Sequence, residues 1–377
     1  MGAPNLRVIL IFLSFSLPPP PRPFLPFSLI GMHASRGRVG WDGGAENSPN
    51  LGYKMAAPAI RHRIEIVPAN RLMNAAQVLQ QNLTLLELVP QLVNIEGCLQ
   101  FLAERALIGN SWTCDVCQER GRLQATEAID GFVWRCPPPC RRRKSIRQGS
   151  FFSKSHLDLK KIIMFIYLWA ADLPLKFIQA EVGCDDKTAT NWANFLRDVC
   201  SEAIIVNMRP LGGFDDDGNP IIVESKFFHR KYHRGAIRDG HWVFGAVERE
   251  SGRFLMRIVE QRNRATLEPI IQQWCLPGTH IISDGWAAYR DLENLNNGVY
   301  LHDVVVHEDN FVDPDLPWLH TNTVEGKWMH AKRKLRRQCG TTRDLFPTYL
   351  DEFLWRNDVG PNKVGEIMNA IRQIYPV

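Results

Sequence analysis

Apolar residues recur every three or four positions along the segment from about Leu72 to Leu107. The run comprises Leu79, Leu83, Leu86, Leu88, Leu92, Ile95, Leu99 and Leu102. This spacing is typical of amphipathic helices, and Pro90 interrupts it because proline cannot continue a helix interior. The pattern predicts a helical region over residues 71–110 with two or three short helices, whose apolar faces form a core rather than a partner surface.

A second helical region is predicted over residues 151–205. Its apolar spacing leads to Pro174, and two shorter helical patterns then flank a turn that contains Gly183. The arrangement is typical of a helix-turn-helix, whose second helix enters the major groove of DNA, or of a plain helical hairpin. In the first case the residues nearest to DNA are Lys187, Thr188, Thr190 and Asn191.

Strand patterns dominate residues 206–360. Three predicted strands are followed by a helix, by a strand that ends at Asp284, and by a late helix that contains Glu325. The predicted elements are Pro220–Phe227, Gly240–Glu248, Arg253–Glu260, the helix Ala265–Cys275, His280–Ser283 and the helix Thr323–Arg337. This order describes an α+β RNase H-like domain, a fold that collects carboxylates at strand ends, where they hold two Mg²⁺ ions. A tail or a helix is expected over residues 361–377.

The N-terminal segment has a different pattern. A short apolar run, Val8–Leu17, follows Arg7 and leads into Pro18–Pro21. The run is too short to cross a bilayer, which takes about 20 residues. We expect residues 1–70 to be a disordered leader, or an upstream extension of a protein that starts at Met55; a signal-peptide core is the alternative.

Composition limits the class of protein. The chain has 377 residues, of which 45% are hydrophobic and 23% are charged. This balance is typical of a soluble protein with two or three domains, and it excludes disordered, collagen-like and multi-span membrane chains. The formal net charge of +5 permits a polyanionic partner without requiring one.

Four of the nine cysteines form two close pairs. Cys114 and Cys117 are separated from Cys136 and Cys140 by 18 residues, a gap typical of a four-cysteine zinc ribbon. The pattern predicts a structural Zn²⁺ site within residues 111–150. Unrelated pairs of free thiols and a disulfide module are the alternatives.

Two clusters of bases accompany these elements. The first follows the ribbon and contains Arg141, Arg142, Arg143, Lys144 and Arg147. The second lies in the late helix and contains Lys332, Arg333, Lys334, Arg336 and Arg337. Both suit contacts to the phosphates of double-stranded DNA, although a solvated surface or a nuclear-import signal would have the same composition. We therefore expect a nuclear protein with DNA as its partner and no membrane association.

Several motifs in order resemble the Merlin superfamily of eukaryotic DNA transposons, which is related to bacterial ISXO-type insertion-sequence transposases. The resemblance covers roughly residues 80–358 and includes the ribbon. Its motifs are Glu224–Phe227, Arg230–Gly235, Trp242–Gly245, Ile282–Tyr289, Asn310–Pro314 and His320–Trp328.

The resemblance implies DDE chemistry with one position altered. Asp284 matches the second metal-binding Asp and Glu325 the third carboxylate, while Lys332, seven residues further on, would touch DNA. Val223 stands where the family has its first Asp, and an apolar side chain cannot bind Mg²⁺. Strand alternation is expected to point the neighbouring Glu224 to the opposite face.

Two hypotheses about function follow. The first is a transposase-derived DNA-binding protein with impaired or lost strand transfer. The second is an active cut-and-paste transposase that uses two Mg²⁺ ions, so whether the chain is an enzyme stays open. The basic clusters disfavour a zinc-dependent module without DNA affinity, and the family resemblance implies a homodimer.

Overall fold

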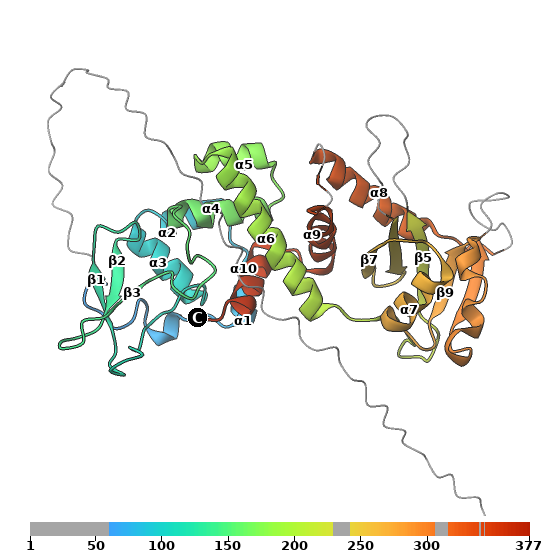
Figure 1. Cartoon of the computed structure of the whole chain (residues 1–377), viewed down its shortest axis with the longest axis horizontal. Helices are drawn as coiled ribbons and strands as arrows, with labels where there is room; N and C mark the ends of the chain where they lie inside the picture. Colours follow the sequence, from blue (N-terminus) through green and yellow to red (C-terminus); the bar gives the residue numbers. More distant parts are fainter. Residues whose placement is uncertain (1–59, 229–241, 306–315, 339–340, 343) are drawn as a thin grey trace, which may run out of the picture. The chain divides into compact units, whose positions relative to one another are not determined.

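The computed structural model describes residues 60–228, 242–305, 316–338, 341–342 and 344–377 (Figure 1). Residues 1–59 of the predicted leader lie outside these residues, as do the motifs Arg230–Gly235 and Asn310–Pro314. The predicted leader boundary at residue 70 is wrong, because Ile60 and Ile66 are fully buried. Among the described residues, no helix combines the length and the apolar character that crossing a membrane requires.

The first helical region, predicted to hold two or three short helices, contains three: α1 (Ala75–Gln80), α2 (Leu85–Gln91) and α3 (Ile95–Glu104). Asn74 and Thr84 begin α1 and α2 with capping boxes. In each, the side chain of the cap accepts a hydrogen bond from the backbone N–H three residues on, and that residue's side chain accepts one from the backbone N–H of the cap. The C-terminal helix α10 (Lys363–Ile374) packs against α1, so the two ends of the described chain meet. A short 3₁₀ turn, η1 (Ala69–Arg71), precedes α1.

Three antiparallel strands follow α3, in the order β1–β2–β3. They are β1 (Arg122–Ala125), β2 (Phe132–Arg135) and β3 (Arg143–Ser145). One cysteine pair precedes β1, and the other lies in the connection between β2 and β3.

The second helical region consists of α4 (Leu159–Ala170), α5 (Leu175–Val182) and α6 (Asp186–Asn207). Gly183 ends α5 with a φ of +63°, a left-handed conformation that suits glycine, and Asp185 caps the first turn of α6. The two helices predicted around Gly183 are therefore present. The long helix α6 also packs against α9 (Phe346–Asp358) and α10.

A five-stranded mixed sheet forms the C-terminal half, in the order β10–β9–β5–β6–β7 (Figure 1). Strands β9 and β10 run parallel to β5, whereas β6 is antiparallel to β5 and to β7. The strands are β5 (Ile222–Phe228), β6 (Trp242–Glu248), β7 (Phe254–Val259), β9 (His280–Asp284) and β10 (Leu301–Val305). The elements predicted for the RNase H-like domain are present in their predicted order; β10 was not predicted.

Helices cover both faces of this sheet. On one face α8 (Asn322–Arg337) contacts β5 and β6, and α9 contacts β7. Side chains of α7 (Arg264–Trp274) join the apolar cluster on the other face. The remaining short elements are β4 (Leu211–Gly212), β8 (Cys275–Leu276), η2 (Ala287–Tyr289) and η3 (Leu292–Asn297).

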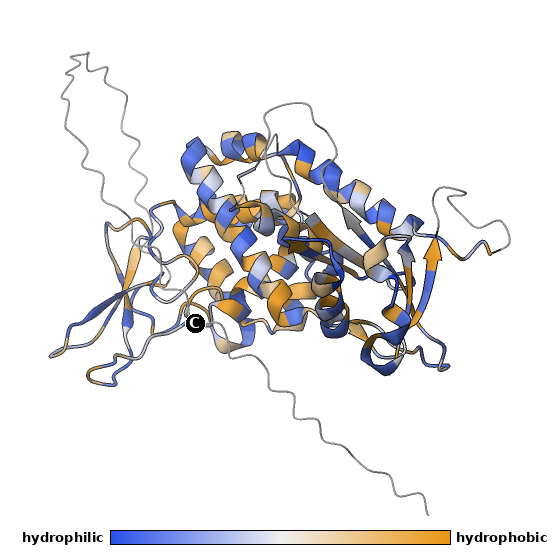
Figure 2. Cartoon of the chain, turned by 45° about the vertical axis from the view of Figure 1, so that its right-hand side comes forward, coloured by the Kyte–Doolittle hydropathy of each residue, from blue (hydrophilic) through white to orange (hydrophobic). Residues whose placement is uncertain are grey.

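Alternation along the strands separates two apolar clusters, and Figure 2 shows apolar residues concentrated where strands and helices face one another. In β6, Val243 and Val247 belong to the cluster under α8 and α9, whereas Phe244 and Ala246 belong to the cluster on the α7 side. Gly245 allows α8 to approach, since a Cβ there would lie 2.8 Å from Nε1 of Trp328.

Candidate functional site

Strand β5 presents alternate side chains to the two faces of the sheet. Val223 is fully buried in the α7-side cluster, and its neighbour across the parallel pairing is Ile281 of the same cluster. The position predicted for the missing Asp therefore points away from α8, which carries Glu325. The prediction that Val223 faces the other carboxylates is wrong, because strand register places it on the opposite side.

Lys226 is the β5 residue that contacts Glu325. It pairs across the sheet with Gly245, the residue against which Trp328 of α8 lies. Its Nζ atom is 2.6 Å from Oε1 of Glu325, and the lysine side chain is 19% exposed. Sequence reasoning missed this lysine, although a charged residue inside an apolar strand is a usable signal.

Asp284 lies beside Lys226 at the carboxyl end of β9. Ser225 and Ser283 are the last pair of the parallel register, so Lys226 and Asp284 stand side by side one residue further on. Ile281 belongs to the α7-side cluster, so alternation turns Asp284 toward α8. The structure thus brings together Asp284, Glu325 and Lys226, which we call the acidic centre.

Glu224 also lies on the α8 side, which corrects the expectation that it would face away from the carboxylates. Its buried carboxylate accepts hydrogen bonds from the Thr323 hydroxyl at 2.7 Å and from the Val324 N–H at 2.9 Å. These groups belong to the first turn of α8, so Glu224 acts as an N-cap supplied by a distant strand. It holds the helix that carries Glu325.

Arg249 completes this support. Its Nε donates to Glu224 at 2.9 Å, and its other nitrogens donate to the carbonyl oxygens of Trp318 at 2.8 Å and His320 at 3.0 Å. The guanidinium therefore joins β5 to the chain segment that leads into α8. The sequence pattern did not single out Arg249, because its partners are 25 and about 70 residues away.

The donor set of the acidic centre does not suit two Mg²⁺ ions. A magnesium pair takes several carboxylate ligands, of which one bridges both ions. Here the structure provides Asp284 and Glu325, the third carboxylate on this side, Glu224, is already bound by Thr323, Val324 and Arg249, and the ammonium group of Lys226 contacts Glu325. Lys332 lies seven residues beyond Glu325 on the same side of α8, half-exposed.

Hydroxyl groups lie on the other face of the same strands. The Ser225 and Tyr289 hydroxyls are 2.9 Å apart, and Oγ of Ser283 is 2.9 Å from Nε2 of His302. Burial raises the pKa of Tyr289 well above its usual value, and burial lowers the pKa of His302 below 6.5. The strands that carry Lys226 and Asp284 are therefore backed by neutral polar groups.

The four predicted cysteines converge on one point. Their sulfur atoms all lie within 4.8 Å of one another, with Cys114 and Cys140 at 3.7 Å and Cys117 and Cys136 at 3.0 Å. Four thiolates around a zinc ion at about 2.3 Å would be about 3.8 Å apart, so this four-cysteine cluster could hold such an ion.

Both turns of the cluster have the same local form. The residue after each second cysteine, Gln118 or Arg141, is left-handed, with φ of +61° and +54°. Backbone N–H groups of Cys117 and Val116 lower the pKa of Cys114 to about 7. The first turn thus favours the thiolate form of Cys114, the form that binds metals.

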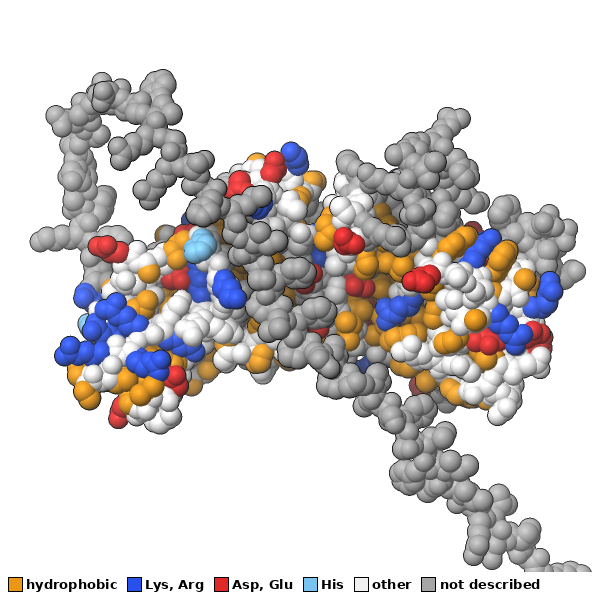
Figure 3. All heavy atoms as spheres, in the orientation of Figure 1, with side chains coloured by type: hydrophobic (Ala, Val, Ile, Leu, Met, Phe, Trp, Pro, Cys, Tyr) orange, Lys and Arg blue, Asp and Glu red, His pale blue; other side chains and the backbone are white. Residues whose placement is uncertain are grey.

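The first basic run is mostly exposed. Arg141, Arg142 and Arg143 are exposed and Lys144 is half-buried, and Lys and Arg side chains gather over the β1–β3 region in Figure 3. Arg147 differs, because it is buried and its guanidinium binds Asp130 at 2.6 Å. The prediction that Arg147 contacts DNA is wrong for this reason.

The second basic run divides in the same way. Arg333, Arg336 and Arg337 are exposed on α8. Lys334 is 13% exposed, with its Nζ 2.6 Å from Asp172 and 3.0 Å from Glu352. Its predicted DNA contact is wrong, because the ammonium group instead ties α8 to α9 and to the turn after α4.

The first turns of α6 present the residues predicted for a DNA groove. Lys187, Thr190 and Asn191 are exposed. Thr188 is half-buried, and its hydroxyl donates to the capping carboxylate of Asp185 at 2.7 Å. The helix pair therefore exposes three of the four predicted residues.

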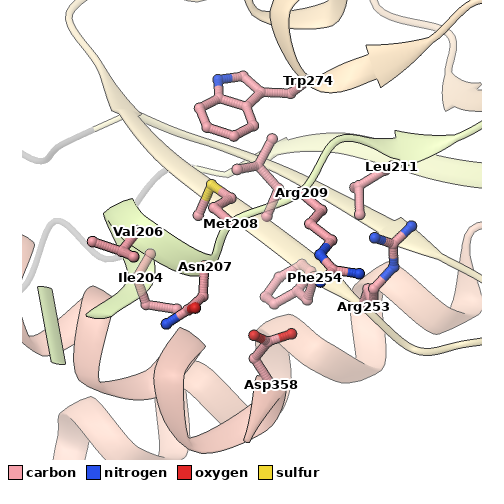
Figure 4. Close-up of a pocket in the computed structure, with 11 residues that line it drawn as sticks. Ile204, Val206, Asn207, Met208, Arg209, Leu211, Arg253, Phe254, Trp274 and Asp358 are labelled. Carbon is pink, nitrogen blue, oxygen red and sulfur yellow. The ribbon is translucent and has the colours of Figure 1, made fainter. Parts of the chain in front are cut away.

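A separate cavity of about 600 Å³ lies between the end of α6, β7 and Trp274 (Figure 4). Figure 4 shows Met208 and Phe254 between Trp274 and Asp358, with Arg209 and Arg253 to one side. None of the predicted site residues lines this cavity. It is distinct from both the acidic centre and the four-cysteine cluster.

Comparisons with known proteins agree with the motifs. Residues 212–358 match the ISXO2-like transposase domain, which confirms the resemblance to ISXO-type transposases over this part of the chain. An uncharacterized transposase-like protein of Haemophilus influenzae is 28% identical over 99 residues, which is 26% of this chain and 76% of that protein.

Solved structures of retroviral integrases are also similar. The HTLV-2 integrase catalytic core domain in complex with magnesium is 16% identical, with 36% of this chain and 83% of that chain covered and a TM-score of 0.25. The catalytic core domain of BIV integrase is 14% identical, with 35% and 80% covered and a TM-score of 0.26.

Proposed function

We propose that this chain is a DNA-binding protein derived from a DDE-type transposase and that its two-metal strand transfer is lost. The contact between Lys226 and Glu325, at 2.6 Å, carries the proposal. Two unit charges 4 Å apart near a protein surface interact by about 4 kcal/mol, so a divalent ion beside this ammonium group would meet strong repulsion. It would also have to compete for the Glu325 carboxylate.

Exposed bases support the DNA-binding half of the proposal. Arg141, Arg142 and Arg143 lie beside the four-cysteine cluster, for which we infer a structural zinc ion, and further exposed arginines lie on α8. Such side chains bind phosphates independently of sequence. We infer that α5 and α6 act as a helix-turn-helix and that Lys187, Thr190 and Asn191 face a DNA groove. We propose a nuclear location in a eukaryotic cell, because the proposed partner is DNA.

An active transposase is the competing function. The retention of Asp284 and Glu325 on one side of the sheet favours it. It would require Lys226 to leave Glu325 and another carboxylate to approach. Binding of Mn²⁺, a spectroscopically visible substitute for Mg²⁺, therefore separates the two functions.

The first test compares Mn²⁺ binding, by electron paramagnetic resonance, in the unmodified chain and in Lys226→Asp. We expect Lys226→Asp to bind at least about tenfold more tightly, because a third carboxylate replaces the cation. A double variant that adds Glu325→Gln should lose the gain. Two tightly bound Mn²⁺ ions in the unmodified chain, or plasmid nicking that Glu325→Gln abolishes, would overturn the proposal.

The second test measures DNA affinity at several salt concentrations. The unmodified chain should bind duplex DNA more weakly as salt rises, and Arg143→Gln should reduce the salt slope by about one. Arg290→Gln, at an exposed arginine outside both basic runs, should leave the slope unchanged. A salt-independent affinity would refute the DNA-binding claim.

A further inference from the structure

Two tryptophans and an arginine form a stack at the edge of the sheet where β9 ends. The guanidinium carbon of Arg262 is 4.2 Å from the ring centroid of Trp242 and 3.6 Å from that of Trp286. Both distances are within the range of cation–π contact, which extends to about 6 Å. We call these three residues the Trp–Arg–Trp cluster.

The cluster presents an apolar ring to solvent. The indole N–H of Trp286 donates to the carbonyl oxygen of Arg262 at 3.0 Å, so the ring's one polar group is satisfied within the protein. Trp286 nevertheless remains 38% exposed, whereas Trp134, Trp192 and Trp328 are 4% exposed or less. Packing of the core alone therefore does not account for Trp286.

Topology places the cluster at the same edge of the sheet as the acidic centre. Trp286 follows Asp284 by two residues at the carboxyl end of β9. Trp242 begins β6 and pairs with Val259, the last residue of β7, three residues before Arg262. Because β6 is antiparallel to β5, its first residues lie at the end of β5 that carries Lys226. Trp242 packs on the α7 side of the sheet, so the cluster and the acidic centre occupy two faces of the same edge.

We propose that the Trp–Arg–Trp cluster stacks an unpaired nucleobase of a DNA strand that passes the edge of the sheet where β9 ends; this inference rests on the proposed DNA binding. Every base has a π-face, and aromatic side chains bind unpaired bases by stacking without reading sequence. The Arg262 guanidinium adds a positive charge next to the strand's phosphates. A base inside a blunt duplex has no free face, so the cluster should favour DNA with unpaired nucleotides.

The test compares three labelled probes by fluorescence anisotropy with the full chain. The probes are a blunt duplex, the same duplex with a four-nucleotide overhang, and a single strand with 2-aminopurine, whose fluorescence falls on stacking. We expect the overhang to improve affinity by about tenfold, as expected for one stacked base, and the 2-aminopurine to be quenched. Trp286→Ala should abolish both effects and leave blunt-duplex affinity unchanged.

Two variants serve as controls. Trp286→Phe retains a ring and should keep most of the overhang preference. Phe214→Ala removes an aromatic side chain that is 59% exposed and lies against Gly278, before β9 begins and hence at the other end of the sheet; it should change nothing.

The outcomes separate the two proposals. Equal affinity for blunt and overhang duplexes, without 2-aminopurine quenching, would overturn the stacking site and leave the DNA-binding function standing. Quenching that persists in Trp286→Ala would also overturn the site. A chain that binds none of the three probes would overturn both proposals.

Discussion

The four-cysteine cluster and the acidic centre are built in opposite ways. In the cluster, two short turns each supply two thiols, and all four sulfur atoms lie within 4.8 Å of one another. In the acidic centre, β5, β9 and α8 each supply one group, and the group from β5 is the ammonium of Lys226. The first donor set is complete for a metal ion, whereas an internal cation takes part in the second.

The difference lies in how far the geometry of each site depends on contacts between distant segments. Each turn of the cluster is local, so the spacing of a cysteine pair largely determines its geometry. The acidic centre depends on strand register, where a shift of one residue sends a side chain to the other face. One lysine with a suitable partner is then enough to change the electrostatics of the whole centre.

The largest expected effect is on the four-cysteine cluster. Cys136→Ser removes one ligand and should reduce zinc from about one ion per chain to near zero, with loss of the folded ribbon, because metal affinity and folding are coupled in such sites. Elemental analysis and circular dichroism measure the two effects. Cys184→Ser, at a half-buried cysteine outside the cluster, should keep its zinc. A purified chain that never contains zinc would contradict the comparison.

The next effect concerns Val223. Val223→Asp places a charge in a fully buried apolar cluster, so it should destabilise the fold by about 3–5 kcal/mol in urea unfolding at pH 7. Burial should raise the pKa of the new carboxyl group. The loss should therefore be smaller near pH 4, where the carboxyl group is neutral in the folded state, and should grow as pH rises.

Val223→Asn is the matched control for this substitution. It has nearly the same shape without a titrating charge, so its loss of stability should not depend on pH. Tight Mn²⁺ binding or DNA nicking gained by Val223→Asp, and not by Lys226→Asp, would show that residue 223 faces Asp284 after all.

A smaller effect is expected at the support of α8. Glu224→Gln weakens the hydrogen bonds to Thr323, Val324 and Arg249 and leaves the arginine without its carboxylate partner. We expect a loss of about 1–3 kcal/mol, with faster hydrogen exchange in the first turn of α8. Glu293→Gln, at an exposed carboxylate, should have no effect on α8 exchange. Unchanged exchange in Glu224→Gln would show that α8 does not depend on this cap.

The sequence predicted local features well. Apolar spacing predicted two or three N-terminal helices, of which three are present, and the order of β5, β6, β7, α7, β9 and α8 followed from alternation and turn residues. Cysteine spacing predicted the four-cysteine cluster, because each of its two pairs lies within one short turn.

Features that depend on distant partners were missed. The side of β5 on which Val223 lies is set by pairing with β6 and β9, and the sequence pattern alone does not determine it. Arg147 and Lys334 read as DNA-binding bases within their runs, yet each has a buried acidic partner, Asp130 or Glu352, from another segment. Arg249 had no local signal, since its function is to join β5 to the segment before α8.

The smallest expected effect is on the pH dependence of stability, and it concerns His302, on the face of the sheet opposite the acidic centre. Burial favours the neutral imidazole of His302 and lowers its pKa below 6.5, so the folded chain binds fewer protons than the unfolded chain. Stability from this residue is present above pH 6.5 and falls as the solution becomes more acidic, because the unfolded chain is protonated first.

His302→Gln can retain a hydrogen bond to Ser283 without titrating, so between pH 7.5 and 5.5 it should lose less stability than the unmodified chain. The difference should be at most about 1.4 kcal/mol, the linkage limit for one proton over this pH range, measured as the free energy of unfolding in urea. Equal losses in both chains would show that folding leaves the pKa of His302 unchanged. A smaller loss in the unmodified chain than in His302→Gln would show that the folded imidazole is the charged form, and the strands under Asp284 would then carry a second cation in addition to Lys226.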